Sequence, residues 1–292
     1  MQYPINYQLI GNFIFQPQVI KTLMKKKVYY WLITILLITT SLLYPLHQLK
    51  NYYSLADEKF TRHNILPKNK DSLLIIFIGD SWAAYHSQYD QQLKKSIETI
   101  VNKPTKVISR GIVGAKTKTI YGKMHADSSS GTKELINMSP DYAIVSAGIN
   151  DAVAKMGTGY YCHHYRLIIK ELLSAGIKPI ILDMPQVDYK AVYQRESMIA
   201  RIRHHISSFV TNTPFWTFDE YREALKSLIS QGEIKKRLIY IPASEWNPEG
   251  YMDSRMLYKE DHVHLNENGY YLLDSCITSH IYKDHKPTLD FQ

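Results

Sequence analysis

Short apolar runs alternate with segments of helical spacing over most of this chain, and this pattern constrains its fold more than any other feature. Residues 73–78 read LLIIFI, and residues 87–101 follow with helically spaced apolar side chains. A continuous apolar run is typical of a strand buried on both faces. Alternating strands and helices predict one α/β domain with a parallel sheet covered on both faces. Further strands are expected at 106–108, 142–146, 178–182 and 215–218, and further helices at 160–175, 189–211, 219–230 and 266–281.

Composition excludes several other classes of protein. Of the 292 residues, 45% are hydrophobic and 21% are charged, which excludes a wholly disordered chain. The 13 glycines and 12 prolines exclude a collagen-like chain, and two cysteines exclude a disulfide-rich scaffold and a four-cysteine zinc site. The net charge of +8 fits either a polyanionic partner or a basic flank beside a membrane segment.

A second kind of apolar segment lies near the N-terminus. Residues 28–46 carry no charged side chain, and their number is close to the ~20 that cross a bilayer as a helix. Residues 1–27 contain four lysines and no acid, which is half of the net charge, and a positive flank favours the cytoplasmic side. We therefore expect a signal anchor at 28–46, a cytoplasmic segment at 1–27 and an extracytoplasmic remainder, with a lipid bilayer rather than a nucleic acid as the partner.

Two alternatives stay open for this region. Ser54 and Ala56 have the small side chains and the spacing of a cleavage site, so the chain is either anchored or secreted after cleavage. Met24 stands directly before three lysines and is an alternative start. Beyond the anchor we expect a tether at 47–71, the α/β domain at 72–283 and a C-terminal tail at 284–292.

Polar motifs follow two of the predicted strands. Gly79-Asp80-Ser81-Trp82 comes directly after residues 73–78. Parallel sheets place their sites at the carboxyl ends of strands, so the Ser81 hydroxyl suits a nucleophile whose own amide helps to hold an oxyanion. The alternative for this motif alone is a helix cap.

Gly148-Ile149-Asn150-Asp151 follows the strand at 142–146 in the same way. Glycine permits a tight turn, and the Asn150 amide can donate a hydrogen bond into the same cleft. A turn with a helix cap is again the alternative.

A third motif, Asp261-His262-Val263-His264, precedes the last predicted helix. Acyl transfer needs a base for the serine proton and a carboxylate that holds the imidazole in one tautomer. Asp261 and His264, three positions apart, can supply both. A metal site is the weaker interpretation, because no third ligand stands at a recognisable spacing.

Together these motifs resemble the SGNH hydrolases, also called the GDSL esterase/lipase family. Ser81 matches its serine block, Gly114 in the segment SRGIVGAKT matches its glycine block, residues 148–151 match its GxND block, and Asp261 with His264 matches its DxxH block. The resemblance covers about residues 70 to 283. It implies a three-layer α/β/α sandwich with a flavodoxin-like parallel sheet and no metal or organic cofactor. Trp82 departs from the small or leucine residue that many family esterases carry there.

The resemblance also implies the role of each residue. Ser81 attacks an ester carbonyl, His264 transfers its proton, and Asp261 orients His264. The amides of Ser81 and Gly114 and the Asn150 side chain stabilise the oxyanion. The remaining motif positions support these groups, and they are Gly79, Asp80, Trp82, Gly148 and Asp151.

Other features are weaker. Aromatic rings before the catalytic motif, at Tyr240, Trp246, Tyr251 and Tyr258, would suit stacking on sugar rings at a cleft rim, and a packed loop is the alternative. Cys162 and Cys276 form either a disulfide or two buried free thiols.

These observations favour a membrane-anchored serine esterase that hydrolyses O-acyl esters, with O-acetyl groups of a polysaccharide as the expected substrate. A polysaccharide O-acetyltransferase with the same triad and a non-catalytic glycan-binding protein of the same fold are the alternatives. The oligomeric state stays open.

Overall fold

The computed structural model describes residues 26–40, 51–59, 63, 67–68, 71–247 and 255–285. The chain divides into two units, residues 1–54 and residues 55–292. Within the described part of the first unit, residues 26–40 are helical. Among all described residues, no helix combines the length and the apolar character needed to cross a membrane. Positions 41–46 of the predicted anchor lie outside the described residues.

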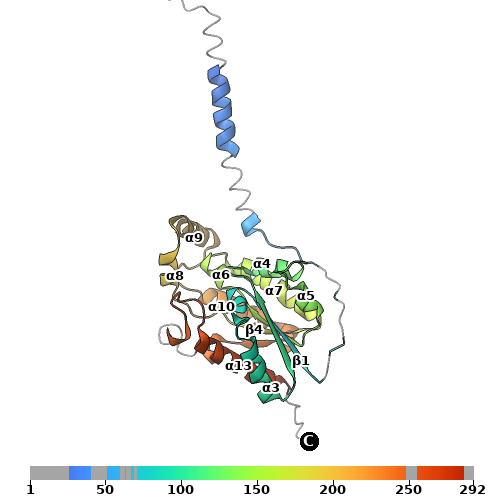
Figure 1. Cartoon of the computed structure of the whole chain (residues 1–292). Helices are drawn as coiled ribbons and strands as arrows, with labels where there is room; N and C mark the ends of the chain where they lie inside the picture. The colour runs from blue at the N-terminus through green and yellow to red at the C-terminus, as the bar shows by residue number, and fades with distance from the viewer. Residues whose placement is uncertain are drawn as a thin grey trace, which may run out of the picture. The chain divides into compact units, whose positions relative to one another are not determined.

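A five-stranded parallel sheet forms the centre of the second unit (Figure 1). Its order is β2-β1-β3-β4-β5, which is the flavodoxin-like order. The expected parallel α/β architecture is therefore confirmed. The strands are β1 (Leu73–Gly79), β2 (Thr105–Gly111), β3 (Tyr142–Ser146), β4 (Lys178–Leu182) and β5 (Ile239–Ile241).

Helices cover both faces of this sheet, because successive side chains of its strands point to opposite sides. Ile76 and Ile78 of β1 pack into one apolar cluster, and Ile75 and Phe77 pack into the other. The first cluster lies under α4 (Thr117–Met124), α5 (Lys133–Asn137), α6 (Ile149–Val153), α7 (Thr158–Ser174) and α10 (Asp219–Ile229). The second lies under α2 (Ser81–His86), α3 (Asp90–Val101), α11 (Ala243–Trp246) and α13 (Glu267–His285).

The predicted fifth strand at 215–218 is wrong, since the strand that pairs with β4 is β5, which follows the 3₁₀ helix Gly232–Arg237. Two aromatic rings of the 215–218 segment, those of Phe215 and Phe218, pack around a buried ammonium group. Lys155 Nζ lies 5.5 Å from the Phe215 ring centre and 4.7 Å from that of Phe218, and it donates a 3.1 Å hydrogen bond to the Pro214 carbonyl. Packing around this cation takes the apolar run away from the sheet.

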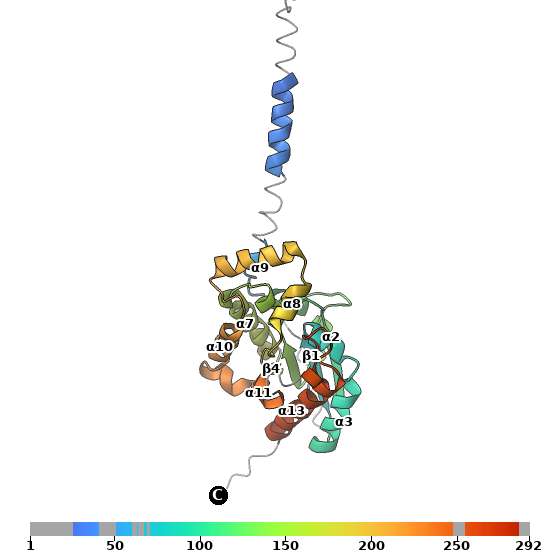
Figure 2. The ribbon, with the colours of Figure 1, turned by 90° about the vertical axis from the view of Figure 1, so that its left-hand side faces the viewer.

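The long helix predicted at 189–211 is two helices, α8 (Tyr189–Arg195) and α9 (Met198–Thr211). The backbone is extended at Glu196 and Ser197, and the Ser197 hydroxyl accepts a 3.2 Å hydrogen bond from the Ala200 amide. A serine that caps a new helix in this way ends the preceding one. Both helices lie at one end of the domain (Figures 1 and 2).

Part of the predicted tether is bound to the domain. The Ala56 amide donates to His164 Nε2 at 3.0 Å, and His163 Nε2 donates to the Ala56 carbonyl at 2.7 Å. The His164 Nδ1 atom donates to the Tyr160 carbonyl, so its Nε2 is free to accept, and burial lowers the pKa of His164 to about 4. Two adjacent histidines of α7 thus fix the point at which the chain enters the domain.

The two cysteines are free thiols. Cys162 packs against the apolar cluster on one face of the sheet and Cys276 against the cluster on the other face. The sheet therefore separates them, and of the two alternatives the free thiols are the one that the structure shows.

Candidate active site

The ends of β1 and β3 are held together at the edge of the sheet. Gly79 has φ +150°, and a Cβ at this position would lie 1.9 Å from the Ser146 carbonyl oxygen. Next to it, the Asp80 amide donates to that carbonyl at 3.1 Å, and the Ser146 hydroxyl donates to the Asp80 carboxylate at 3.1 Å. Burial raises the pKa of Asp80 to about 7, although the hydrogen bonds that its carboxylate accepts from the Trp82 amide and the Ser146 hydroxyl lower it. The supporting roles expected of Gly79 and Asp80 thus have a local structural basis.

Ser81 is the first residue of α2, and its hydroxyl meets the imidazole predicted from the sequence. His264 Nε2 lies 2.8 Å from Ser81 Oγ, and His264 Nδ1 lies 2.6 Å from an Asp261 carboxylate oxygen. The other Asp261 oxygen accepts the amides of Val263 at 3.0 Å and of His264 at 2.9 Å. Burial would raise the pKa of Asp261, but these hydrogen bonds lower it overall. An ionised Asp261 keeps the proton on Nδ1, which leaves Nε2 to accept the serine proton.

Asn150 and the glycine block are in contact with each other. Asn150 Nδ2 donates to the Ala115 carbonyl at 3.0 Å, so the asparagine amide binds the loop that contains Gly114. Gly114 has φ +74°, and no atom lies within 4 Å of where a Cβ would stand. The backbone at Gly114 is therefore open on this side.

Asp151 holds the same loop through hydrogen bonds to Thr117. Its carboxylate accepts the Thr117 amide at 2.9 Å and the Thr117 hydroxyl at 2.7 Å, at the start of α4. Burial is the largest influence on this carboxyl and raises the pKa of Asp151 to about 6. Gly148, with φ +115°, passes so close to the Tyr161 ring that a Cβ would lie 2.5 Å from it. These contacts give Gly148 and Asp151 of the GxND block a positioning role.

Trp82 braces the loop that carries the histidine. Its indole is buried, packs edge to face on Trp246, and donates from Nε1 to the Val263 carbonyl at 3.2 Å. The departure from the family pattern at this position therefore serves the packing of the site.

The predicted aromatic platform is placed differently. Trp246 and Tyr258 are buried, and the Tyr258 hydroxyl donates to the Gln186 carbonyl at 3.1 Å. Tyr240 is half-buried on β5 with its hydroxyl on Asp183. Tyr251 lies outside the described residues. Trp246 and Tyr258 thus belong to the core, because an aromatic ring that lies over an apolar cluster gains more free energy from burial than from exposure.

Three side chains near the site escaped the sequence analysis. The Tyr85 ring meets the His264 ring edge to face with centres 4.8 Å apart, and Lys259 Nζ lies 4.9 Å above Tyr85. Arg195 of α8 donates to the Glu260 carbonyl at 2.7 Å, next to Asp261. Tyr85 stands four positions after Ser81, and this spacing places both side chains on the same face of a helix, which could have predicted that Tyr85 lies near the site.

A second histidine network lies behind the serine helix. His86 is fully buried, with Nε2 2.8 Å from Asp274 and Nδ1 2.9 Å from the Ser109 hydroxyl and 3.2 Å from Asp90. Burial alone would lower the pKa of His86, but the two carboxylates outweigh it and raise the pKa to about 9. The network joins α2, β2, α3 and α13.

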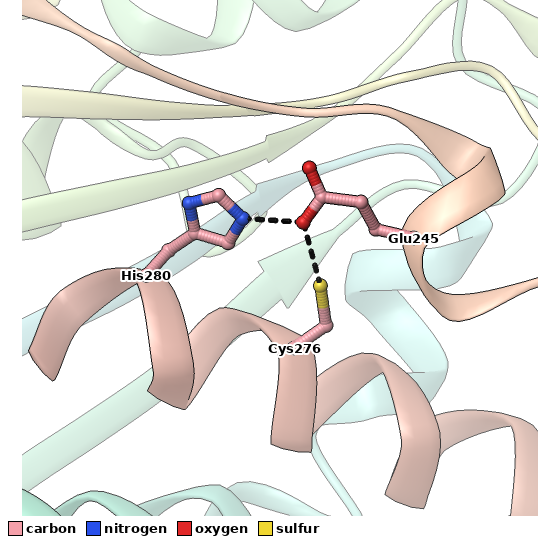
Figure 3. A group of neighbouring side chains, drawn as sticks. All are labelled: Glu245, Cys276 and His280. Atoms are coloured by element: carbon pink, nitrogen blue, oxygen red, sulfur yellow. Dashed lines mark hydrogen bonds and ion pairs between the residues drawn. The ribbon is translucent and has the colours of Figure 1, made fainter. Parts of the chain in front are cut away.

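Among the described residues, one group of three side chains has ligand atoms close enough together to hold a metal ion, and it includes no residue of the catalytic motifs. His280 Nε2 lies 2.7 Å and Cys276 Sγ 3.7 Å from the same Glu245 oxygen (Figure 3). These hydrogen bonds pair the three groups with one another and connect α11 to α13. The residues of the catalytic motifs are thus separate from this cluster.

Comparisons with known proteins agree with this geometry. The model of the GDSL-like Lipase/Acylhydrolase family matches residues 77–272. A search of curated proteins found no match. Among solved structures, a lipase/acylhydrolase from Enterococcus faecalis has a TM-score of 0.53 at 19% identity and covers 74% of this chain and 98% of its own.

Two further structures are similar at the same level. A GDSL-like lipase from Bacteroides thetaiotaomicron has a TM-score of 0.51 at 15% identity, with 75% of this chain and 91% of its own covered. The acetyl xylan esterase AlAXEase has a TM-score of 0.50 at 16% identity, with 71% and 98% covered. At these identities the likeness shows a shared fold.

Proposed function

The chain belongs to the GDSL-like lipase/acylhydrolase family and is an ester hydrolase of that type, and from this premise we propose that Ser81, His264 and Asp261 act as its catalytic triad. The observation that carries the proposal is the continuous pair of hydrogen bonds from Ser81 Oγ to His264 and from His264 to Asp261. Such a pair lets one imidazole accept and return a proton without changing its tautomer.

The reaction follows from these positions. His264 Nε2 takes the proton from Ser81 Oγ as the oxygen bonds to the ester carbonyl carbon, and the carbonyl oxygen becomes an anion. The imidazolium returns the proton to the leaving alcohol, the C–O bond breaks, and an acyl-serine remains. Water repeats the sequence and releases the acid.

Hydrogen-bond donors for the anion stand at the strand ends. The Ser81 amide opens α2, the Gly114 amide lies on the loop that Asp151 holds, and Asn150 Nδ2 has a second proton besides the one donated to Ala115. Donors aimed at a developing charge are usually the largest contribution to such catalysis.

The proposed substrate is an O-acetyl ester on a polysaccharide. Support comes from the shared fold with an acetyl xylan esterase and from the apolar, positively flanked segment at 28–46, which would place the domain outside the cytoplasm. Anchorage through this segment, or secretion after its cleavage, brings the enzyme to surface or external glycans.

The experiment compares the full chain with Ser81→Ala on a short-chain aryl ester and on an acetylated polysaccharide. Ser87→Ala is the matched control, since Ser87 is exposed and lies at the opposite end of the same helix. We expect Ser81→Ala to lose hydrolysis of both substrates and to lose covalent labelling by a fluorophosphonate, while Ser87→Ala keeps all three. Undiminished hydrolysis by Ser81→Ala would refute the triad, and hydrolysis of the aryl ester alone would refute the glycan substrate.

A further inference from the structure

The α9 helix exposes its apolar face and buries its small and polar face. The side chains that point into the domain are Ala200, His204 and Ser207. The outward side chains lie within about 120° of the helix circumference. They are Met198, Ile199, Ile202, Ile206, Phe209 and Val210, with exposed fractions from 49% to 88%.

Six large apolar side chains on one exposed helix face form a contiguous apolar patch. Such patches mark interaction surfaces, so we expect a partner to cover this face. The chemistry of the helix identifies the partner class. Arg203 is exposed at one edge of the apolar face, Arg201 at the other edge packs over the Tyr193 ring, and residues 198–211 contain no acidic side chain. An apolar face with arginines at its edges is typical of helices that lie in the interface of an anionic bilayer.

The path of the chain supports the same partner. Ala56 is fixed on His163 and His164 of α7, so nine residues, 47–55, separate the predicted anchor from the domain. Nine extended residues reach at most about 30 Å. An anchored chain would therefore keep the α7 entry point close to the membrane.

The α9 helix lies beside that entry point. The Thr211 hydroxyl at the end of α9 donates to the Lys155 carbonyl at 3.2 Å, and the Thr211 side chain lies 3.1 Å from where a Cβ on Gly157 would stand. Gly157 directly precedes α7, and His163 follows about 9 Å further along that helix at 1.5 Å per residue. The entry point at Ala56 and α9 are therefore at the same end of the domain.

We propose that the apolar face of α9 inserts into the interface of the bilayer that holds the 28–46 segment. This inference rests on the anchorage in the proposed function. The helix would lie in the membrane plane with Phe209 and Ile206 among the acyl chains and the exposed Arg203 at the headgroups. This contact with the membrane would fix the orientation of the domain. Arg195 at the end of α8 donates to the Glu260 carbonyl, so α8 connects α9 with the loop that contains Asp261 and His264.

The test uses the full chain, with Cys162 and Cys276 changed to Ala, reconstituted in vesicles of phosphatidylcholine and phosphatidylglycerol. A bimane fluorophore is placed in three separate variants, Phe209→Cys on α9, Ile35→Cys in the N-terminal helix and Thr99→Cys on α3. Thr99 is exposed and α3 lies at the opposite end of the domain from α9 (Figures 1 and 2). Lipids with a spin label at a known depth quench a fluorophore only within the bilayer.

We expect quenching at Phe209, strongest for a label about 5–10 Å below the headgroups, together with quenching at Ile35 and none at Thr99. Quenching at Ile35 without quenching at Phe209 would overturn the inference but would still support the anchor. Absence of quenching at both would overturn the anchor and the inference with it. Self-crosslinking of unlabelled Phe209→Cys without quenching would show instead that a second copy covers α9. Ester hydrolysis by the same variants reports on the triad independently.

Discussion

The Nε2 atom of His264 lies 2.8 Å from Ser81 Oγ, although 183 positions separate the two residues in the sequence. The serine is fixed by the end of β1, whereas the histidine sits on a loop closed by a bridge between Tyr258 and Leu265. The triad therefore depends on how that loop is attached to α2, and Trp82 provides the direct attachment through Val263.

We expect Trp82→Phe to weaken catalysis by loosening this attachment. The substitution keeps an aromatic ring against Trp246 but removes the hydrogen bond to Val263, which contributes about 1 kcal/mol, a factor of ~5 when expressed in kcat. Trp246→Phe is the matched control, because the buried Trp246 Nε1 has no hydrogen-bond partner among the described residues. Kinetics and thermal unfolding of both variants check this. An equal loss of kcat in both would show that ring packing, and not the hydrogen bond, positions His264.

Asp261→Asn is expected to lower kcat by about 10⁴-fold with little change in stability, because an amide nitrogen facing Nδ1 selects the wrong imidazole tautomer. Asp261 is partly exposed and lies on a loop, so the fold should tolerate the change. Steady-state kinetics and a melting curve are the measurements. A loss of only a few-fold in kcat would mean that the loop amides alone orient His264.

Asn150→Ala is expected to lower kcat by ~100- to 1,000-fold, the usual effect of removing one oxyanion donor. The lost hydrogen bond to Ala115 should cost only about 1 kcal/mol of stability. Thr117→Val separates the two effects, since it removes one of the hydrogen bonds that hold the loop and leaves Asn150 in place. If both variants lost kcat equally, Asn150 would act by positioning the Gly114 loop.

The sequence predicted the parts of the fold that depend on local pattern. Four strands, from β1 to β4, follow from apolar runs, and the proposed triad follows from one motif at a strand end and one before the last helix. The segment 215–218 was wrongly predicted as a strand because Phe215 and Phe218 pack against the buried Lys155 and not in the sheet. A contact between residues this far apart in the sequence produces no periodic pattern of apolar side chains. Trp246 was misplaced for a similar reason, since its partner Trp82 lies on a different element.

The outward face of α9 shows the same limit. Its apolar residues have ordinary helical spacing, which predicts a helix but does not say which face meets the core. Only the packing of Ala200, His204 and Ser207 against the domain reveals that the apolar side points away from it.

The buried His86 network predicts how stability depends on pH. The native state keeps the His86 proton up to a pKa of about 9, whereas the unfolded chain releases it near pH 6.5. Between these values the native state binds more protons, so the free energy of unfolding falls as pH rises, by on the order of 3 kcal/mol in all. The contribution is complete below pH 6.5 and is lost as pH passes through about 9.

Denaturant unfolding at a series of pH values measures this fall. Asp274→Asn is the informative variant, because it keeps the size and one acceptor of the side chain but removes a charge that holds the proton on His86. We expect the decline in this variant to begin near the same pH but to end at a lower pH, and to be smaller in total than in the natural chain. An identical decline in both proteins would show that His86 is not the group that titrates. Neither His86 nor Asp274 belongs to the proposed triad, so this test of stability is independent of the tests of catalysis.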